Sequence, residues 1–437
     1  MKIDKNRKVV QDLVHSAPAA SLVADAQISN LREIATLWAG YGSIICVDLK
    51  LSKEREDQGK RRFILKVINP PQAELSDGGQ GPDEGHLRKL LSYWVEANFY
   101  GGLGRSLLNS SICGPHSSIS TLHSALNASL PSSQKNHALS QDERSSIQAI
   151  LLDDIRDVGF PHLAEEMRGT LNQDQTKAAL RWLAHFHAHF AGYLPSQPSD
   201  ECPPPLKAWS KSSSSSSWNG NGVWQIGGYS YVETRLTELE QIPDNSIWAR
   251  LGVKGDLAYA IDWSLAEGSP SGMAGQTLIH GDVKSANLAF SQDGHRAAAY
   301  DFQFVGRGVG VTDLAKFLTT SVSAAAMNKQ GEDALLRYYH DQFISAVKAE
   351  PEPLWTRTGD TTTSLLESRR AASEYSYEDF LVHWDLAVLS WQRFQAGWGA
   401  WGNVQWTQTR AKQILERPGW SAAVLQRWRN RTEQAEQ

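Results

Sequence analysis

The sequence predicts a mixed α+β protein in which strands and one helix form the first third and helices form most of the remainder. The first observation is that apolar runs at residues 37–51, 62–68 and 149–155 have the length and composition of strands. The second is that residues 87–103, between these runs, look helical. The third is that long segments after residue 174 place apolar side chains at helical spacing.

The composition is that of an ordinary globular chain of 437 residues, with 41% apolar and 21% charged residues. The formal net charge of −5 gives no reason to expect nucleic acid as a partner. No apolar run approaches the roughly 18 residues of a membrane span, and the charged start of the chain argues against a secretory signal. Cys46, Cys113 and Cys202 are scattered without the spacing of a metal site, so we expect reduced thiols and a cytoplasmic location.

The first strand region contains a turn of small residues. Within residues 37–51, two apolar segments are joined by a turn that contains Gly40, Gly42 and Ser43, which predicts a hairpin. Small residues there would let backbone N–H groups approach phosphates, although a plain turn is the alternative. In the next strand Lys66 interrupts an apolar run. Because burying an unpaired lysine is costly, we expect an anion beside it; the alternative is an edge-strand lysine that points to solvent.

The centre of the candidate site is the stretch 278–303. Two short apolar runs in it end in carboxylate or amide side chains, with Asp282 and Asn287 after the first run and Asp301 after the second. These side chains can supply one base and two ligands to a hard cation, which is what phosphoryl transfer from ATP requires. The alternative for each residue alone is a turn or a helix cap.

The pattern H-G-D-x-x-x-x-N followed by D-F-Q resembles the catalytic core of the aminoglycoside phosphotransferase and choline kinase superfamily, nearest the ecdysteroid-kinase-like group of small-molecule kinases. The resemblance implies that Asp282 is the catalytic base and that Asn287 and Asp301 hold Mg²⁺. It also implies that Lys66 contacts the phosphates of ATP and that Glu96 forms a salt bridge with this lysine.

The resemblance further implies a two-lobed, protein-kinase-like fold. A leader at residues 1–34, in which Val9, Val10, Leu13 and Val14 have helical spacing, precedes a nucleotide-binding small lobe at 35–152 with an antiparallel sheet and one helix. A large, mostly helical lobe at 153–437 would carry catalysis and acceptor binding, with a mobile insertion at about 194–222 that is either a lid or a tolerated insertion. Where the lobes join, backbone groups of four residues would line the adenine pocket: Leu152, Asp153, Asp154 and Ile155.

Several residues of the large lobe are expected to have structural roles. His187 would pack behind the catalytic loop, and Asp313 would cap the helix that follows the metal aspartate. A helix is also expected to open near residue 224. Arg393 and the tryptophans around it either face the acceptor or belong to the core, with the arginine in a structural ion pair.

These features predict an ATP- and Mg²⁺-dependent phosphotransferase that acts on a hydroxyl group of a small molecule. The segment after Asp301 lacks A-P-E, so a protein substrate is disfavoured. The alternatives are an inactive kinase-like scaffold or nucleotide-binding module, and a metal-dependent hydrolase that uses the same carboxylates. The acceptor stays open between a sterol-like alcohol, an amino alcohol and a sugar, and the oligomeric state is not predicted.

Overall fold

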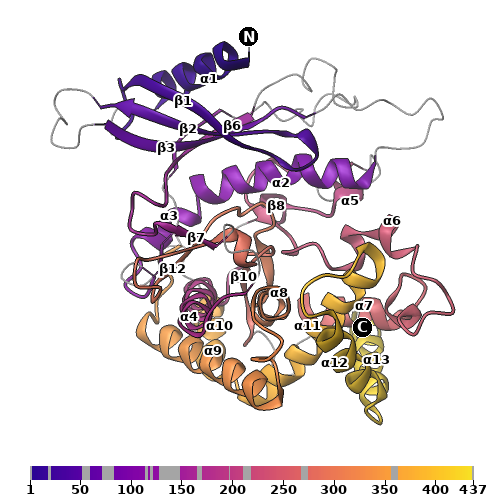
Figure 1. The fold of residues 1–437 in the computed structure, drawn as a ribbon. Helices are drawn as coiled ribbons and strands as arrows, with labels where there is room; N and C mark the ends of the chain where they lie inside the picture. The colour runs from indigo at the N-terminus through magenta and orange to yellow at the C-terminus, as the bar shows by residue number, and fades with distance from the viewer. Residues whose placement is uncertain are drawn as a thin grey trace, which may run out of the picture.

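A computed structural model shows a five-stranded sheet and its helices at one end of the molecule and a mostly helical part at the other (Figure 1). The fold is therefore mixed α+β, as the sequence predicted. The residues that the structure describes are 2–17, 21–51, 60–70, 83–113, 117–118, 122–126, 148–164, 170–195, 197–209, 218–266, 274–355 and 363–435.

The large sheet is antiparallel throughout and has the order β1-β2-β3-β6-β5. Its strands are β1 (Gln27–Thr36), β2 (Gly42–Lys50), β3 (Lys60–Ile68), β5 (Leu122–Leu126) and β6 (Gln148–Asp153). Helix α1 (Lys2–Ser16) covers one face and α2 (Glu84–Gly101) lies on the other (Figure 1).

The sheet determines which way Lys66 points. Strand β3 pairs with β2 on one side and β6 on the other, with Lys66 opposite Ile44 and Ile150. Its neighbours Leu65 and Val67 pack in the core that contains α1. Because successive side chains alternate between faces, Lys66 points to the α2 face. An edge-strand lysine exposed to solvent is excluded.

The described residues at 2–17 and 21–34 belong to the sheet body, which is the large sheet with α1 and α2, and this corrects their interpretation as a separate leader. The four valine and leucine side chains of α1 predicted from helical spacing are buried against β2 and β3. Strand β1 begins at Gln27. The predicted first strand segment at Leu37 is wrong, because the 3₁₀ turn Trp38–Gly40 connects β1 to β2 there. A strand run interrupted by polar side chains, as in β1, carries little sequence signal.

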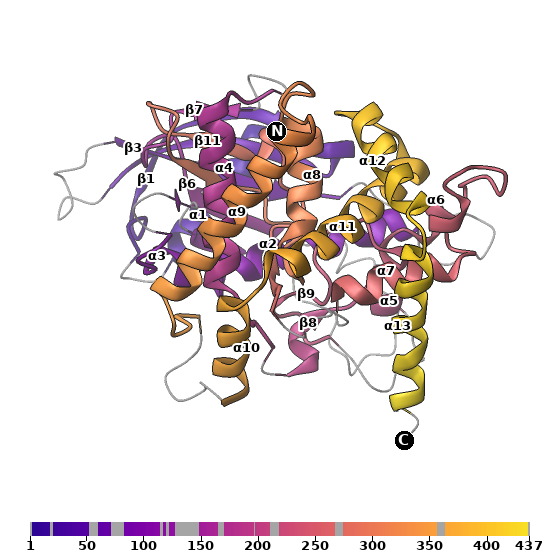
Figure 2. The ribbon, with the colours of Figure 1, turned by 90° about the horizontal axis from the view of Figure 1, so that it is seen from below.

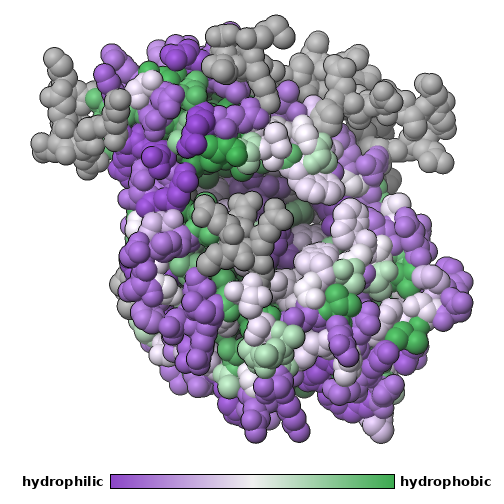
Figure 3. Space-filling model, in the orientation of Figure 1, coloured by the Kyte–Doolittle hydropathy of each residue, from purple (hydrophilic) through white to green (hydrophobic). Residues whose placement is uncertain are grey.

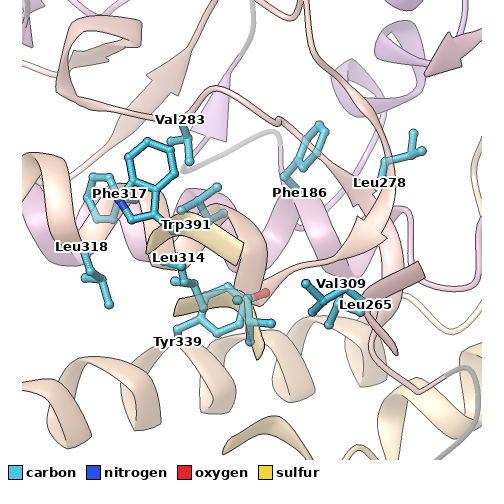
Figure 4. Close-up of a cluster of buried hydrophobic side chains, with 14 of the residues drawn as sticks. Phe186, Leu265, Leu278, Val283, Val309, Leu314, Phe317, Leu318, Tyr339 and Trp391 are labelled. Atoms are coloured by element: carbon cyan, nitrogen blue, oxygen red, sulfur yellow. The ribbon is translucent and has the colours of Figure 1, made fainter. Parts of the chain in front are cut away.

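Helices dominate the C-terminal part (Figure 2), where α4 and α9 lie side by side. The longer ones are α4 (Gln173–His189), α7 (Asp256–Ala266), α8 (Val311–Ser321), α9 (Lys329–Ala349), α10 (Thr363–Ser373), α11 (Tyr377–Trp398), α12 (Val404–Glu416) and α13 (Trp420–Ala435). Short helices are α3 (Gly104–Leu108), α5 (Pro205–Trp209) and α6 (Leu236–Leu239). Figure 4 shows part of the core that joins them, with Phe186 of α4, Leu314 of α8 and Trp391 of α11.

Two small sheets support the central stretch of the candidate site. One has the order β10-β13-β9-β8, with strands Gln276–Ile279, Gly306–Val309, Val223–Trp224 and Glu201–Cys202. The other has the order β4-β12-β11-β7, with strands Ser117–Ser118, Ala297–Ala299, Leu288–Phe290 and His162–Leu163.

The described residues of the segment 194–222 include secondary structure, which corrects the prediction of one mobile insertion for them. The segment contains β8 and α5, and β8 pairs in parallel with β9. Glu201 of β8 forms an ion pair of 2.7 Å with Arg307 of β13. The serine run at 210–217 lies outside the described residues. The α-helix expected near residue 224 begins only at Leu236, because β9 ends at Trp224 and a 3₁₀ helix at Val232–Thr234 precedes α6.

Among the described residues, no helix has the length and apolar character needed to cross a membrane. Cys46, Cys113 and Cys202 are buried free thiols.

Candidate active site

Strand pairing brings the two predicted site loops together. Strand β10 ends at Ile279, which is opposite Gly306 of β13, and β11 pairs with β12. The loops 280–287 and 300–305 therefore leave neighbouring strands. The Tyr300 backbone N–H donates to the Asn287 carbonyl at 3.1 Å. The site thus lies where the two connections between the small sheets meet, from β10 to β11 and from β12 to β13.

Within this site, the side chain of Asn287 forms hydrogen bonds with Asp282. Its amide donates to the Asp282 carbonyl at 2.9 Å and to Oδ2 of the carboxylate at 3.1 Å. Asp301 has a φ of 69°, in the left-handed region that side chains with a Cβ seldom adopt. Strained backbone of this kind is common at functional sites, because the surrounding structure must hold it.

Asp313 holds the loop that carries Asp282. Its two carboxylate oxygens accept the backbone N–H groups of His280 at 2.7 Å and of Gly281 at 2.9 Å. His187 Nε2 lies 3.1 Å from the same carboxylate, and its Nδ1 lies 2.7 Å from the Tyr339 hydroxyl. The buried histidine therefore packs behind the loop, as expected. The cap predicted for Asp313 is wrong, since α8 has Gly310 at its N-cap and Asp313 instead bonds to a distant loop.

Gly281 is required by a close approach between two backbone segments. Its φ is 79°, and a Cβ there would lie 2.2 Å from the Phe304 carbonyl oxygen and 2.6 Å from the Gly228 nitrogen. Gly294 has a similar φ of 75°, but the nearest atom to its Cβ would be 3.8 Å away. Both glycines have a left-handed φ, but only at Gly281 would an added Cβ clash with neighbouring atoms.

We expect Gly281→Ala to lower the free energy of unfolding by about 1–3 kcal/mol more than Gly294→Ala. Both variants carry the cost of a positive φ, about 1–2 kcal/mol, so their difference measures the clash at residue 281. Chemical denaturation of the two variants and the wild type tests this. Equal losses of unfolding free energy in the two variants would show that the loop accommodates the added methyl group at no cost.

Phe302 connects the loop to helix α2. Its ring is buried and stacks on Phe99 of α2 with ring centroids 4.4 Å apart, and it lies 4.6 Å from the His280 ring. Trp182 and Phe186 of α4 also contact it. A shift of α2 would thus be transmitted to the residues on either side of Phe302.

Lys66 joins the sheet, helix α2 and the second loop. Its Nζ donates to Glu96 Oε2 at 2.6 Å and to Asp301 Oδ1 at 2.9 Å. Burial lowers the pKa of Lys66, but the charges of Asp301 and Glu96 outweigh burial and hold the pKa above its ordinary value. The predicted salt bridge between Lys66 and Glu96 is present, and the lysine is charged.

Gln303, which stands where protein kinases have the glycine of D-F-G, is hydrogen-bonded to Asp301. Its amide donates to Asp301 Oδ1 at 2.7 Å, and its Oε1 accepts the Ser92 hydroxyl of α2 at 3.0 Å. The glutamine therefore adds a second link between α2 and the loop of Asp301.

The carboxylate of Asp282 is surrounded by residues that sequence reasoning did not single out. Oδ1 accepts the Tyr229 hydroxyl at 2.6 Å and is bonded to the Lys316 ammonium, and Oδ2 accepts Lys284 Nζ at 2.9 Å. Burial alone would raise the pKa of Asp282, but the two lysines hold it well below its usual range. Lys316 interrupts an apolar run, Leu314–Leu318, which is the signal that identified Lys66.

The residues of the predicted glycine turn lie in different surroundings: Gly40 is in the turn, whereas Gly42 and Ser43 are in β2. Gly40 lies in the turn with a φ of 75°, and a Cβ added there would have no atom of the described residues within 4 Å. At Gly42, by contrast, a Cβ would lie 1.9 Å from the Val67 carbonyl oxygen. Ser43 is already inside β2, where its hydroxyl donates to Glu33 Oε1 at 3.1 Å. The exposed residues of this segment are therefore 38–40, and the Gly40 N–H already donates to the Leu37 carbonyl at 3.1 Å.

The predicted adenine-binding segment lies at the end of β6. Leu152 and Ile155 are buried, and both acidic side chains between them are engaged. Asp153 accepts from Arg61 at 2.9 Å, and Asp154 binds Arg156 through two bonds of 2.8 and 2.6 Å. Backbone groups of this segment are engaged as well: Leu152 pairs with β3 and β5, and the carbonyls of Asp154 and Ile155 accept the N–H groups of Asp157 at 2.9 Å and Phe160 at 3.2 Å. The face of the molecule in Figure 3 is hollowed between the sheet body and the helical part.

The site brings together a set of side chains that also occurs in protein kinases. A strand lysine paired with a helix glutamate, a loop aspartate, an asparagine five residues on and a second aspartate are the parts that protein kinases use for phosphoryl transfer.

Solved structures similar to this chain include small-molecule kinases. An ethanolamine kinase from Plasmodium vivax is 11% identical, with 93% of this chain and 84% of that chain covered and a TM-score of 0.39. A choline/ethanolamine kinase family protein from Mesorhizobium loti is 11% identical, with 97% and 99% covered and a TM-score of 0.37. An aminoglycoside-3'-phosphotransferase of type VIII is 13% identical, with 80% and 93% covered and a TM-score of 0.35.

Sequence comparisons add one match. The model of the DUF1679 family, described as "Uncharacterized oxidoreductase dhs-27", matches residues 269–360, which include Asp282, Asn287 and Asp301. A search of curated proteins finds no match to this chain.

Proposed function

We propose that this protein is a phosphotransferase that uses ATP and Mg²⁺ to phosphorylate a hydroxyl group of a small molecule. The observation that carries the proposal is the position of Lys66, which bonds at once to Glu96 of α2 and to Asp301 of the second loop. The Lys66–Glu96 pair corresponds to the lysine–glutamate pair that active protein kinases must form before transfer, and the bond to Asp301 puts the lysine beside a proposed metal ligand.

Lys66 is suited to bind phosphate oxygens. An ammonium group has three donors, and two are used by Glu96 and Asp301. The third donor is available for the α- and β-phosphates. The turn at Gly40 and Gly42 would contribute backbone N–H groups to the same phosphates, and the backbone at Leu152–Ile155 would bind the adenine.

Asn287 and Asp301 fit a Mg²⁺ site in their chemistry, because amide and carboxylate oxygens are the ligands that this cation prefers. Both hydrogen bonds to the Asp301 carboxylate, from Lys66 and Gln303, end on Oδ1. The side chain of Asp301 is 29% exposed, although its partner Lys66 is buried. When bound, Mg²⁺ would neutralise negative charge on the β- and γ-phosphates.

Asp282 would orient the acceptor hydroxyl and take up its proton. Its depressed pKa makes it a weak base. That suits phosphoryl transfer, in which most of the barrier is lowered by positioning and electrostatics. We place nucleotide binding in the sheet body and acceptor binding in the helical part. We also propose a cytoplasmic location, which the three free thiols favour.

The test is to measure ATP binding with and without Mg²⁺, followed by transfer to pooled alcohols with products read by mass spectrometry. We expect tighter binding with Mg²⁺ and at least one phosphorylated alcohol. Nucleotide binding without any product would favour the inactive nucleotide-binding module. If the protein neither binds ATP nor forms a phosphorylated product, the proposal is contradicted.

Lys66→Met is expected to weaken ATP·Mg²⁺ binding about 10- to 100-fold, the loss of a hydrogen bond between charged groups of about 1.5–3 kcal/mol. Isothermal titration measures the affinity. The matched control is Lys254→Met, which removes an exposed lysine paired with Asp244 at 2.7 Å. An unchanged affinity in Lys66→Met would exclude the lysine from the nucleotide site.

A further inference from the structure

A second buried lysine lies directly against Asp282. Lys316 of α8 is 4% exposed, and its ammonium contacts both Asp282 Oδ1 and the Tyr229 hydroxyl. It also lies 4.1 Å from the centre of the Tyr229 ring and 5.5 Å from that of Trp391. Aromatic faces stabilise a cation at such distances.

The pairing explains how this charge is tolerated. Burying an ammonium group is costly unless an opposite charge is close, and Asp282 supplies that charge. Burial lowers the pKa of Lys316 to about 8, with Asp282 and Asp313 raising it and Lys284 lowering it. Lys316 is thus mainly charged at neutral pH.

The two oxygens of Asp282 have different surroundings. Lys316 and Tyr229 both contact Oδ1 from the helical part. Lys316 lies in a helix whose side chains are mostly buried. The Tyr229 ring packs against Phe304 and Phe394, with ring centroids 4.6 and 5.1 Å away. Oδ2 is bonded to Asn287 and to Lys284, and the Lys284 side chain is 32% exposed. Oδ2 therefore has one partner that reaches solvent, Lys284, and one that is buried, Asn287.

We infer that Lys316 is a positioning residue that, together with Tyr229, fixes Asp282 by its Oδ1 oxygen and so presents Oδ2 to the acceptor hydroxyl. This inference rests on the proposed phosphotransferase function. In this role Lys316 acts through Asp282. Its removal should change how well Asp282 is oriented, and leave the nucleotide side of the site as it is.

The experiment combines Lys316→Met, Lys316→Arg, Asp282→Asn and the double variant Asp282→Asn/Lys316→Met. We expect Lys316→Met to lower kcat about 10- to 100-fold with the KM for ATP unchanged, and Lys316→Arg to recover part of the loss. In the Asp282→Asn background the same methionine substitution should lower kcat no further, because effects of residues that act as a unit are not additive. Lys254→Met is the control for loss of a lysine elsewhere.

Two results would overturn the inference: an unchanged kcat in Lys316→Met, or equal losses of kcat with and without the Asp282 carboxylate. Denaturation midpoints of the same variants give a readout that does not need activity. There the double variant should shift the midpoint by less than the sum of the single shifts, whereas additive shifts would contradict the contact. If the wild type phosphorylates nothing, the proposed function fails, and the midpoints alone then decide whether Lys316 holds Asp282.

Discussion

Replacing Asp282 with asparagine is expected to lower the rate of phosphoryl transfer by about 10²- to 10⁴-fold, the usual contribution of a general base. Asparagine keeps the size of the side chain and can still accept a hydrogen bond from Tyr229. It cannot take up the hydroxyl proton, and it removes the negative charge between Lys284 and Lys316. ATP·Mg²⁺ binding should change little, because Lys66 and Asp301 keep their contacts. The measurements are product formation by mass spectrometry and ATP affinity by titration.

The control for this variant is Asp244→Asn, since Asp244 is an exposed carboxylate that also pairs with a lysine. It should retain full activity. If Asp282→Asn transferred phosphate as fast as the wild type, the aspartate would have no part in the reaction. If it lost ATP binding together with turnover, the variant would have disturbed the nucleotide site, and Asp282→Glu and Asp282→Ser would be needed to separate the two effects.

Replacing Arg393 with methionine is expected to lower the free energy of unfolding by about 3–5 kcal/mol, the usual cost of removing one partner of a buried ion pair. The Arg393 side chain is fully buried. Its guanidinium donates to the Ser230 carbonyl at 2.9 and 3.1 Å and to the Ala258 carbonyl at 2.9 Å, and it forms an ion pair with Asp262. Methionine would leave these acceptors without their donor. Chemical denaturation measures the loss.

The matched control is Arg337→Met, which breaks an exposed pair with Asp333 four residues earlier on α9. That change should leave the free energy of unfolding almost unchanged, because an exposed ion pair is screened by solvent. The comparison also decides between the two sequence interpretations of Arg393. A stable Arg393→Met variant with an altered KM for the acceptor would place the arginine in the acceptor site, whereas the structure makes it part of the core of the helical part.

The four polar residues with the clearest predictions were those that interrupt or end short apolar runs. Lys66, Asp282, Asn287 and Asp301 stand out because a strand that is buried on both faces is apolar throughout, so a charged or amide side chain in it or at its end needs a reason. Asp282, Asn287 and Asp301 are close in sequence, and the pairing of β11 with β12 keeps them close in space. Lys66 lies 235 residues from Asp301, and only the tertiary structure brings these two residues together. Glu96 was found through the resemblance, since helical spacing alone did not decide which way it faced.

The sequence by itself determined the mixed α+β class, the strand that carries Lys66 and the loop residues Asp282, Asn287 and Asp301, because local patterns encode strands, turns and motif spacing. Only the tertiary structure decided that α1 and β1 complete the sheet body and that the segment at Glu201–Cys202 is ordered. It also decided that Tyr229 and Lys316 hold Asp282, although they lie 53 and 34 residues from it in sequence. Contacts over such separations depend on how helices pack against each other, and a single chain's periodicity shows which face of a helix is apolar but not what that face will meet.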